Sequence, residues 1–375
     1  MTPVKVLHVF GCMQHGGAEM RTVDVMCHID RERFSFHYAT LSGLPGELDD
    51  RIRALGGEVH PVKLGLDFPW TFRRLLSAHQ FDAVHSHVHY ASGFVLRLAA
   101  MAKVPVRIAH FRSTEDGQGD SIRRRLQRKI LKRWIDRYAT HILAVCEGAM
   151  NASWGQDWAQ DPRAQTVYNG LDLAAYHGPP DPEGVRREFN IPAGSVLCTH
   201  VGRFSPPKNH GRLLAIFAQV LRHTPGTYLV LVGGGSPDAE SPIRDRASEL
   251  GLADRVVFAG VRDDVPRLLL AADLMIFPST WEGLPGAVLE ACAAGLPVLA
   301  SDLPGVQEIA RFFPGVDCIS LEESDQVWCD RALRLLASAG DPPGRPADRE
   351  SGFARSPFSI ERAVMAFEDT YCYRP

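Results

Sequence analysis

The sequence predicts an α/β protein made of two tandem Rossmann-like, doubly wound domains. Three observations lead to this prediction. The chain has 375 residues, enough for two domains that each bury a core without disulfide or metal staples. Strand-like runs alternate with helical stretches along both halves, which is typical of parallel sheets covered by helices. Between Tyr168 and Gly194 the alternation gives way to a segment rich in proline and glycine, as expected at a domain boundary.

The elements of the first half follow one another in a regular order. A strand at 4–10 runs into a glycine-bearing loop, and a helix is predicted from about Ala18. Further strands are predicted at 34–41, 57–62, 81–87, 106–111 and 141–145. Helices are predicted near 47–55, 70–79, 91–102, 121–138 and 147–154.

The alternation restarts after the boundary segment. Strands are predicted at 196–202, 228–235, 255–260, 274–279 and 297–301, and helices near 209–223, 242–250, 264–272 and 285–294. A last helix is predicted from about Ser359 to Tyr371, and in this layout it can cross back to the first domain. We therefore divide the chain into a first domain (1–172), a linker (173–194), a second domain (195–355) and a C-terminal helix (356–375).

The composition limits the kinds of protein that this chain can be. Apolar residues make up 45% and charged residues 23%, so disorder, collagen and a coiled coil are excluded for the chain as a whole. The net charge of -3 gives no general reason to bind nucleic acid, so any anion site must be local. The eight cysteines form no C-x-x-C pair, and no apolar run reaches membrane-spanning length. We expect a cytoplasmic protein.

A pair of glutamates marks the most informative loop, since ligands of open parallel sheets bind beyond the carboxyl ends of the strands. After the strand at 274–279, Glu282 lies in the loop, Pro285 is placed to open a helix, and Glu290 lies inside that helix among small and apolar residues. A carboxylate there either faces water or accepts hydrogen bonds from a ligand such as a sugar diol. The amides at the helix start suit a phosphate. The alternative is that both glutamates only cap or solvate the helix end.

Two cations follow another strand of the same predicted sheet. The strand ends at Val201, Gly202 allows close backbone approach, and Arg203 and Lys208 precede a helix near Asn209. Arginine offers a fixed fork for phosphate and lysine a mobile charge, so the two together can neutralise a diphosphate. Two cations in a loop are often only surface charges, but the acidic loop at the same edge of the sheet favours a binding function.

The first domain carries weaker signals. The loop that ends in Gly16 and Gly17 either lets backbone amides approach an anionic group or is a plain tight turn. His110, at the end of the strand 106–111, is a candidate for contacting a sugar hydroxyl, with a structural histidine as the alternative.

Three alternating histidines, His85, His87 and His89, should share one face of a strand, which suggests a metal site. No nearby carboxylate or thiolate completes a ligand set, so no metal is expected there.

The helix predicted at 121–138 carries eight cations, and its apolar residues recur at three- and four-residue intervals. Contact with an anionic membrane surface, at the inner face of the membrane, or with an anionic acceptor is one interpretation. A helix packed on the core with a solvated basic face is the other, which the pattern favours.

The ordered motifs as a set resemble those of glycosyltransferase family 4, retaining enzymes of the GT-B fold, in which two Rossmann-like domains face a cleft. The resemblance rests on GGAE at 16–19, VCEGAM at 145–150, YNGLD at 168–172, HVGRFSPPKNH at 200–210, LVGGGS at 231–236, VVFAGVRDDVPRLLLAADLMIFPS at 256–279 and EGLPGAVLEACAAGLPVLASD at 282–302. It covers nearly the whole chain, and the later motifs are the specific ones.

The resemblance implies roles for individual residues. Glu290 would bind the nucleotide ribose, Glu282 would face the donor sugar, Arg203 and Lys208 would bind the diphosphate, and His110 would contact the sugar. Backbone near Val261 and Arg262 would hold the base, and the remaining donor-binding positions would be Gly16, Gly17, Gly202, Gly283, Leu284, Pro285 and Gly286. Many members have EGFG where this chain has EGLPG, so Pro285 removes one amide from the pocket.

The implied reaction is the transfer of a hexose from a nucleotide-diphosphate sugar to an acceptor hydroxyl with retention of configuration. No metal or other cofactor is expected, and the chain has no D-x-D motif. The acceptor would be a saccharide, a lipid-linked saccharide or a small molecule.

Other functions predict other features. A nicotinamide dehydrogenase needs G-x-G-x-x-G after the first strand and an acidic residue ending the next, and neither is present. A sugar phosphorylase or a nucleotide-sugar epimerase on the same fold remains an alternative, as does a degenerate transferase that only binds a partner.

Overall fold

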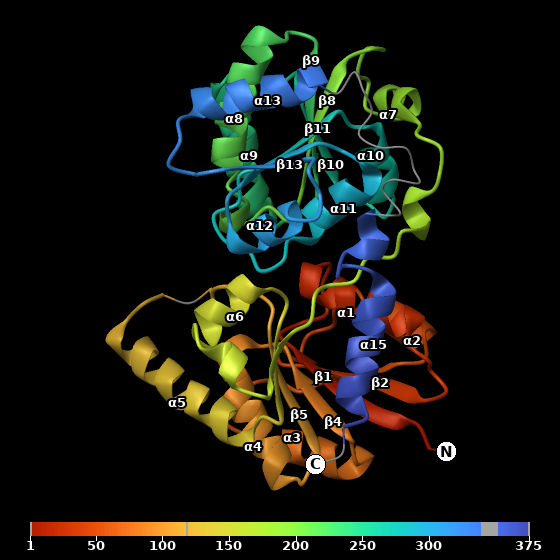
Figure 1. Ribbon diagram of the computed structural model, residues 1–375, viewed down its shortest axis with the longest axis vertical. Helices are drawn as coiled ribbons and strands as arrows, with labels where there is room; N and C mark the ends of the chain where they lie inside the picture. Colours follow the sequence, from red (N-terminus) through yellow and green to blue (C-terminus); the bar gives the residue numbers. More distant parts are fainter. Residues whose placement is uncertain (1, 118, 339–351, 374–375) are drawn as a thin grey trace. The chain divides into compact units, whose positions relative to one another are not determined.

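Two parallel sheets, each covered by helices, organise the chain (Figure 1). The computed structural model describes residues 2–117, 119–338 and 352–373. Unit 1 comprises Met1–Leu171 and Pro357–Pro375, and unit 2 comprises Asp172–Ser356. The prediction of two Rossmann-like domains is confirmed, because each unit has its own parallel sheet with helical crossovers.

Unit 1 has a seven-stranded sheet in the order β3-β2-β1-β4-β5-β6-β7. Its strands are β1 (Val4–Phe10), β2 (Phe34–Thr40), β3 (Glu58–Pro61), β4 (Ala83–Ser86), β5 (Val106–Phe111), β6 (His141–Ala144) and β7 (Ala164–Thr166). Its helices are α1 (Gly17–His28), α2 (Asp49–Ala54), α3 (Phe68–His79), α4 (Ser92–Met101), α5 (Ile122–Tyr138), α6 (Glu147–Ser153) and α15 (Ile360–Tyr371), with short 3-10 turns η1 (His89–Ala91) and η2 (Trp158–Gln160).

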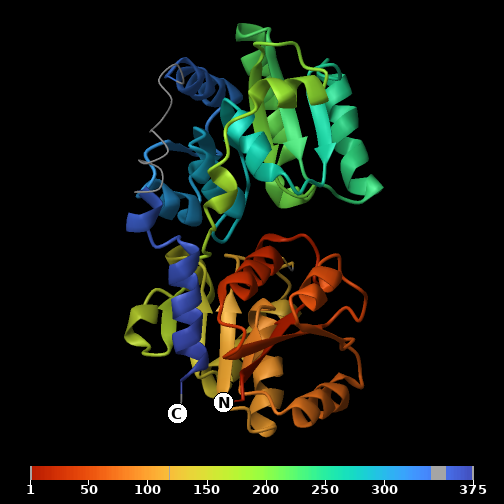
Figure 2. The same ribbon diagram turned by 90° about the vertical axis from the view of Figure 1, so that its right-hand side faces the viewer.

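The last helix, α15, is part of unit 1, which confirms that it crosses back to the first domain. Figures 1 and 2 show it in blue along the sheet of unit 1, and it packs beside α1. The amide of Leu171 donates to the carbonyl of Phe358 over 2.9 Å just before the helix begins. Burying a phenylalanine or isoleucine side chain contributes about 1.5–3 kcal/mol. The α15 side chains in the core of unit 1 are Ile360, Ala363, Phe367 and Tyr371.

Unit 2 has a six-stranded sheet in the order β10-β9-β8-β11-β12-β13. Its strands are β8 (Val196–Val201), β9 (Thr227–Val232), β10 (Val256–Gly260), β11 (Leu274–Phe277), β12 (Val298–Ser301) and β13 (Val316–Ile319). Its helices are α7 (Pro182–Glu188), α8 (His210–His223), α9 (Pro237–Glu249), α10 (Val265–Ala271), α11 (Gly286–Ala294), α12 (Pro304–Ala310) and α13 (Asp325–Ser338), with 3-10 turns η3 (Ala174–Tyr176) and η4 (Pro206–Lys208).

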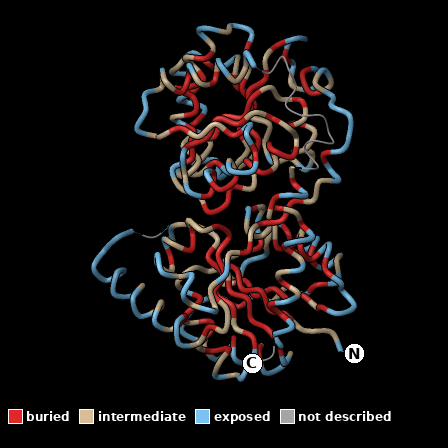
Figure 3. Tube along the Cα trace, in the orientation of Figure 1, coloured by how far each residue is buried: buried red, intermediate tan, exposed pale blue. Residues whose placement is uncertain are grey.

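The core of unit 2 follows the apolar periodicity of its helices. In α8, Leu213, Leu214, Phe217 and Val220 recur at helical spacing and are all fully buried against the sheet. Figure 3 shows the same distribution in both units, with buried residues along the central strands and exposed residues along α5. The strand ends are therefore held by a rigid core, which positions the loops that follow them.

The structure corrects several predicted boundaries. Much of the segment 173–194 is not a free linker: η3 and α7 fold as part of unit 2, because Val185 and Ile191 are buried in a cluster with Leu197 of β8. Helix α9 begins at Pro237, five residues before the predicted start, since a proline is tolerated in the first turn. Four further elements, β7, α12, β13 and α13, were not predicted from the sequence; β7 and β13 are very short, and polar residues interrupt them.

Candidate functional site

The strand order of unit 2 reverses between β8 and β11. Strands β9 and β10 lie on one side of β8, and β11, β12 and β13 lie on the other. Ligands of open α/β sheets bind at this switch point, beyond the carboxyl ends of the two central strands. Both loops that the sequence singled out, after β8 and after β11, begin at this place.

The loop after β8 is held closely against the loop after β9. The amide of Gly202 donates to the carbonyl of Val232 over 2.9 Å, and the amide of Phe204 donates to Gly234 over 2.8 Å. Gly233 has a φ of +138°, and a Cβ there would overlap the carbonyl oxygen of Gly202. A glycine is therefore required at 233, in the loop after β9, while the side chain of Arg203 in the loop after β8 is exposed.

Lys208 and Glu282 form an ion pair at the switch point. Lys208 Nζ lies 2.6 Å from Glu282 Oε1, and only 18% and 16% of the two side chains are exposed. The same Nζ lies 4.7 Å from the ring centroid of Phe277, the last residue of β11. Separate roles were expected for Lys208 and Glu282, and the structure brings the two side chains into direct contact. A diphosphate would present more negative charge to Lys208 than one carboxylate does.

Backbone and side-chain hydrogen bonds fix the two loops to each other. Asn209, which adopts a left-handed φ of 53°, donates through Nδ2 to the carbonyl of Pro278 over 3.1 Å. The amide of Thr280 donates to the carbonyl of Pro207 over 2.8 Å. The loops after β8 and β11 are therefore one connected structure, and Lys208 is held in place without a ligand.

Helix α11 presents its start to the same loops. It begins at Gly286, and Pro285 is its N-cap rather than its first residue, so the predicted start is one residue early. Glu290 is half-buried between Leu289 and Ala291, which are both fully buried. It lies about one helical turn beyond the free amides of the helix start. Gly283 and Leu284, which precede the helix, are buried.

Two histidines that the sequence analysis did not assign lie behind this site. His200 of β8 is fully buried, and its Nδ1 lies 2.9 Å from the carbonyl oxygen of Ile276. His210, the first residue of α8, is 4% exposed, and the two rings are 5.1 Å apart. Burial lowers the pKa of His200 well below its usual value and that of His210 to about 4, and the charge of Lys208 adds to both effects. Both imidazoles are therefore neutral, and they stand at the two ends of the motif at 200–210.

The predicted base-binding segment follows β10. Val261 is exposed, and a Cβ on Gly234 would lie 2.8 Å from its Cγ2, so this segment borders the glycine loop after β9. The guanidinium of Arg262 is engaged by Asp264 over 2.7 Å and by Glu188 over 2.8 Å. The hydrogen bond with Asp264 contributes most, and that with Glu188 contributes less, to raising the pKa of Arg262. The side chain is thus tied to its neighbours, and base binding by the backbone stays a prediction.

The remaining predicted residues lie in unit 1. Gly16 is the extended N-cap of α1, and a Cβ there would meet the carboxylate of Glu19, whereas the space around Gly17 is open. His110 ends β5 and is fully buried, with Nδ1 2.9 Å from Nε2 of His85. Its Nε2 has no hydrogen-bond partner in the part of the chain that the structure describes. Donor or sugar contacts of these residues stay predictions.

The expectation that His85, His87 and His89 share one strand face is wrong for His89. Strand β4 ends at Ser86, and His89 adopts a φ of 48° in η1, so the alternation stops. The rings of His85 and His87 are 4.1 Å apart, and Nδ1 of His8 lies 3.1 Å from Nε2 of His87.

Helix α5 fits the favoured prediction of a core-packed helix only in its C-terminal half, which packs on α4, where a Cβ on Gly93 would meet Leu131 and Trp134. Its only buried residue is Ile135, and Ile122, Leu126 and Ile130 are 84%, 60% and 46% exposed. Apolar side chains and cations therefore lie together on an exposed surface. Among the described residues no helix combines the length and apolarity needed to cross a membrane.

Comparisons with known proteins agree with the resemblance seen in the sequence. The family model for glycosyl transferases group 1 matches residues 183–313, and that for the glycosyl transferase 4-like domain matches residues 16–170. The chain is 32% identical to the putative glycosyltransferase EpsF of Bacillus subtilis, over 98% of this chain and 96% of that protein.

Two further comparisons extend this result. The chain is 30% identical to CapH, a capsular polysaccharide biosynthesis glycosyltransferase of Staphylococcus aureus, over 89% of this chain and 91% of that protein. Its fold matches the crystal structure of HepE from Anabaena in complex with UDP, with a TM-score of 0.80 and 20% identity over 98% of this chain and 99% of that chain. At that identity the match is evidence for the fold alone.

Proposed function

This chain belongs to the glycosyltransferases of the GT-B fold, and we propose that it transfers a hexose from a UDP-linked donor to a saccharide hydroxyl with retention of configuration and without a metal. The observation that carries the proposal is the Lys208–Glu282 pair at the switch point of unit 2, with Glu290 one turn inside the adjoining helix. HepE binds UDP, and on the likeness of fold alone we propose uridine as the nucleoside of the donor.

Each part of the donor has a chemically suited partner in unit 2. The carboxylate of Glu290 accepts both hydroxyls of the ribose. Lys208, the exposed Arg203 and the amides at the start of α11 bind the diphosphate. Backbone near Val261 and Arg262 holds the base, and Glu282 faces the hexose. Gly202 matters because it lets the backbone approach the phosphate without a Cβ.

Departure of the diphosphate is the step that these residues assist. The bond between the anomeric carbon and the phosphate oxygen breaks while the acceptor oxygen bonds to the same face of that carbon. The acceptor proton passes to the departing phosphate oxygen. Lys208, Arg203 and the start of α11 stabilise the negative charge that develops on the diphosphate, an electrostatic role worth about 3–4 kcal/mol per donor in comparable sites. These groups supply positive charge that a metal supplies in other transferases.

We further propose a saccharide acceptor presented at a lipid surface. The name of CapH, a transferase of capsular polysaccharide biosynthesis, supports a saccharide. Helix α5 supports the proposal of a lipid surface, because its exposed residues Ile122, Leu126 and Ile130 lie on a helix with eight cations. Anionic headgroups attract such cations, and apolar side chains insert below them. Contact would be peripheral.

The test is to measure binding of UDP, GDP and ADP by calorimetry and transfer from the matching hexose donors. We expect UDP to bind most tightly. Glu290→Ala and Lys208→Ala should each lower kcat/KM by at least about 100-fold, or about 2.7 kcal/mol, because the ribose and diphosphate lose their partners. Glu249→Ala and Arg222→Ala, exposed in the same unit, are the matched controls and should leave turnover unchanged.

Several results would contradict the proposal. Near-normal turnover of the folded Glu290→Ala or Lys208→Ala variant would remove the site assignment. Turnover that requires inorganic phosphate, or epimerisation without an acceptor, would favour the phosphorylase or epimerase alternative.

A further inference from the structure

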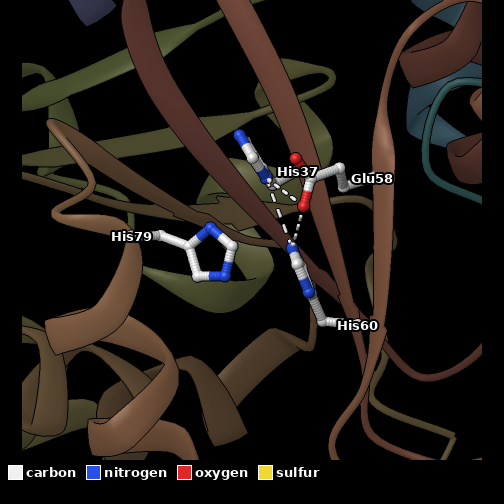
Figure 4. Close-up of side chains that lie close together, drawn as sticks. All are labelled: His37, Glu58, His60 and His79. Atoms are coloured by element: carbon white, nitrogen blue, oxygen red, sulfur yellow. Dashed lines mark hydrogen bonds and ion pairs between the residues drawn. The ribbon is translucent and has the colours of Figure 1, made fainter.

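Three histidines and one glutamate, none of them assigned to the transfer reaction, converge on one face of the sheet of unit 1 (Figure 4). His37 comes from β2, Glu58 and His60 come from the edge strand β3, and His79 ends α3. The neighbours of His37 on β2, Phe36 and Tyr38, belong to the core that contains α15. Because side chains alternate along a strand, His37 and the cluster lie on the opposite face of the sheet.

The pairing of two strands creates this cluster. His37 lies opposite Glu58 in the parallel register, and Ala39 lies opposite His60, so Glu58 and His60 project two residues apart on the same face. His79 reaches the same place because α3 ends beside the strands. The residues are far apart in the sequence, and only the folded sheet brings them together.

Three of the four ligand atoms are spaced nearly as in a tetrahedral metal site. Metal–nitrogen and metal–oxygen bonds of about 2.0–2.1 Å place ligand atoms about 3.3 Å apart in a tetrahedron. Nδ1 of His37 lies 3.2 Å from Nε2 of His60 and 3.7 Å from Oε2 of Glu58, and the latter two atoms are 3.6 Å apart. One nitrogen of His79 lies within 4.8 Å of the other three ligand atoms. A rotation of the His79 side chain that brings this nitrogen closer to the other three atoms would complete the tetrahedron.

Neighbouring groups already orient the ligands. Ser35 Oγ lies 3.3 Å from Nε2 of His37, which leaves Nδ1 for the cluster, and such outer-shell bonds are typical of metal-binding histidines. The ring of Phe81 packs 5.1 Å from that of His37 and 5.4 Å from that of His79. Lys5 is the nearby cation, and its Nζ donates to the carbonyl of His79 over 3.2 Å.

The cluster is both protected and accessible. The side chain of His37 is 5% exposed and that of His60 is 17% exposed, whereas that of Glu58 is 57% exposed. An ion can therefore enter on the side of Glu58 without unfolding the sheet. The carboxylate also supplies negative charge that offsets part of the charge of the ion.

A second group of imidazoles in unit 1 lacks these properties. His8, His85 and His87 also lie close enough to share an ion, but they are joined by hydrogen bonds to one another, to His110 and to Tyr371. No carboxylate belongs to that group, and the charge of Arg112 acts on it. A buried cation there would be opposed rather than neutralised.

We propose that His37, Glu58, His60 and His79 bind a divalent transition-metal ion of the zinc class. Three imidazoles and one carboxylate in a tetrahedron are ligands that zinc accepts, whereas magnesium and calcium prefer oxygen ligands. With four protein ligands the site is closed, and it ties β3 and the end of α3 to β2. The ion has a structural role, separate from the metal-free transfer proposed for unit 2.

The experiment uses the full chain without an affinity tag, treated with a chelator and then dialysed. Zinc is titrated against a chromophoric chelator, and thermal unfolding is followed with and without zinc. We expect one equivalent to bind and the melting temperature to rise by several degrees, because the ion binds only the folded chain. Cobalt should give the visible absorption of a tetrahedral site, and magnesium should have no effect.

Variants locate the site. Glu58→Gln, at a largely exposed position, should fold normally and lower zinc affinity at least about tenfold. His60→Ala should remove the cobalt absorption. His28→Ala, an exposed histidine of the same unit, is the matched control and should bind zinc normally. Failure of the wild-type chain to bind zinc, or unchanged binding by the Glu58→Gln and His60→Ala variants, would overturn the proposal.

Discussion

The two units have the same strand order at their centres but place different chemistry at the switch point. In unit 2, where β8 meets β11, the loops carry the Lys208–Glu282 ion pair. In unit 1, where β1 meets β4, the strands carry His8 and His85, which burial keeps neutral by lowering their pKa values. Charged groups suit the diphosphate of a donor, and neutral imidazoles suit hydroxyl groups. One architecture thus holds an ion pair at one switch point and buried neutral imidazoles at the other.

The largest difference that we expect between the two units is in their stability at acidic pH. The folded pKa of His8 is about 3, and burial holds those of His85 and His110 well below their usual value. The unfolded chain therefore binds more protons below about pH 6.5. Stability is complete above that pH and falls, as the pH drops toward the folded pKa values, by about 1.4 kcal/mol per pH unit for each such histidine.

Unit 2 contains two comparable histidines, His200 and His210, so it should lose stability more slowly. Hydrogen-exchange protection, corrected for the intrinsic rate at each pH between 7.5 and 4.5, measures the two units separately. We expect β1, β4 and β5 to lose protection at a higher pH than β8 and β11. Earlier loss in unit 2 would show that the buried imidazoles do not distinguish the units.

An intermediate effect should separate binding of charge from transfer. In the Glu282→Gln variant, Lys208 loses its partner, so UDP without a sugar should bind as tightly as to the wild type or up to about tenfold more tightly. Transfer should nevertheless fall by about tenfold or more, because Glu282 faces the hexose. Calorimetry with UDP and initial rates with the UDP-hexose measure the two quantities.

His110→Gln in unit 1 is the paired variant. It should leave UDP affinity within about twofold and lower transfer, if its melting temperature matches the wild type. Weaker UDP binding by the Glu282→Gln variant would contradict the view that Glu282 and the diphosphate compete for Lys208.

The smallest effect on stability should come from the surface of α5. Leu126→Ala combined with Ile130→Ala should change the free energy of unfolding by no more than about 0.5 kcal/mol, since both side chains are largely exposed. Cosedimentation with vesicles of anionic lipid should fall several-fold, and added salt should weaken it further. Phe312→Ala, at an exposed apolar position of unit 2, should leave cosedimentation unchanged. If the Phe312→Ala variant lost as much cosedimentation as the α5 variant, α5 would have no special role in binding lipid.

Local patterns predicted most of the fold. Apolar runs ending in glycine indicated β1, β8 and β9, and helical spacing indicated α8 and α15 within one residue of their observed starts. Elements were missed or misplaced where the local residue pattern does not favour one kind of secondary structure. Strand β13 has Asp317 in its middle, and α9 contains Pro242, so neither follows a simple pattern.

The residues of the donor site could be predicted, but their contacts could not. Lys208 and Glu282 are separated by 74 residues, and they meet because β8 and β11 are adjacent in the sheet. No local spacing specifies that adjacency. The cluster at His37 is a similar case, since it depends on the register of β2 and β3 and on the place where α3 ends.

The position of α15 has a consequence for synthesis of the chain. A ribosome completes β1 to β7 first, yet the aromatic side chains of Phe367 and Tyr371, which belong to the core of unit 1, are synthesised only after all of unit 2. Phe367 follows the end of β7 at Thr166 by 201 residues, which at about 5–20 residues per second takes roughly 10–40 s. During that interval the apolar face of the nascent sheet that α15 later covers is exposed, and we expect chaperones to bind it until α15 has been synthesised.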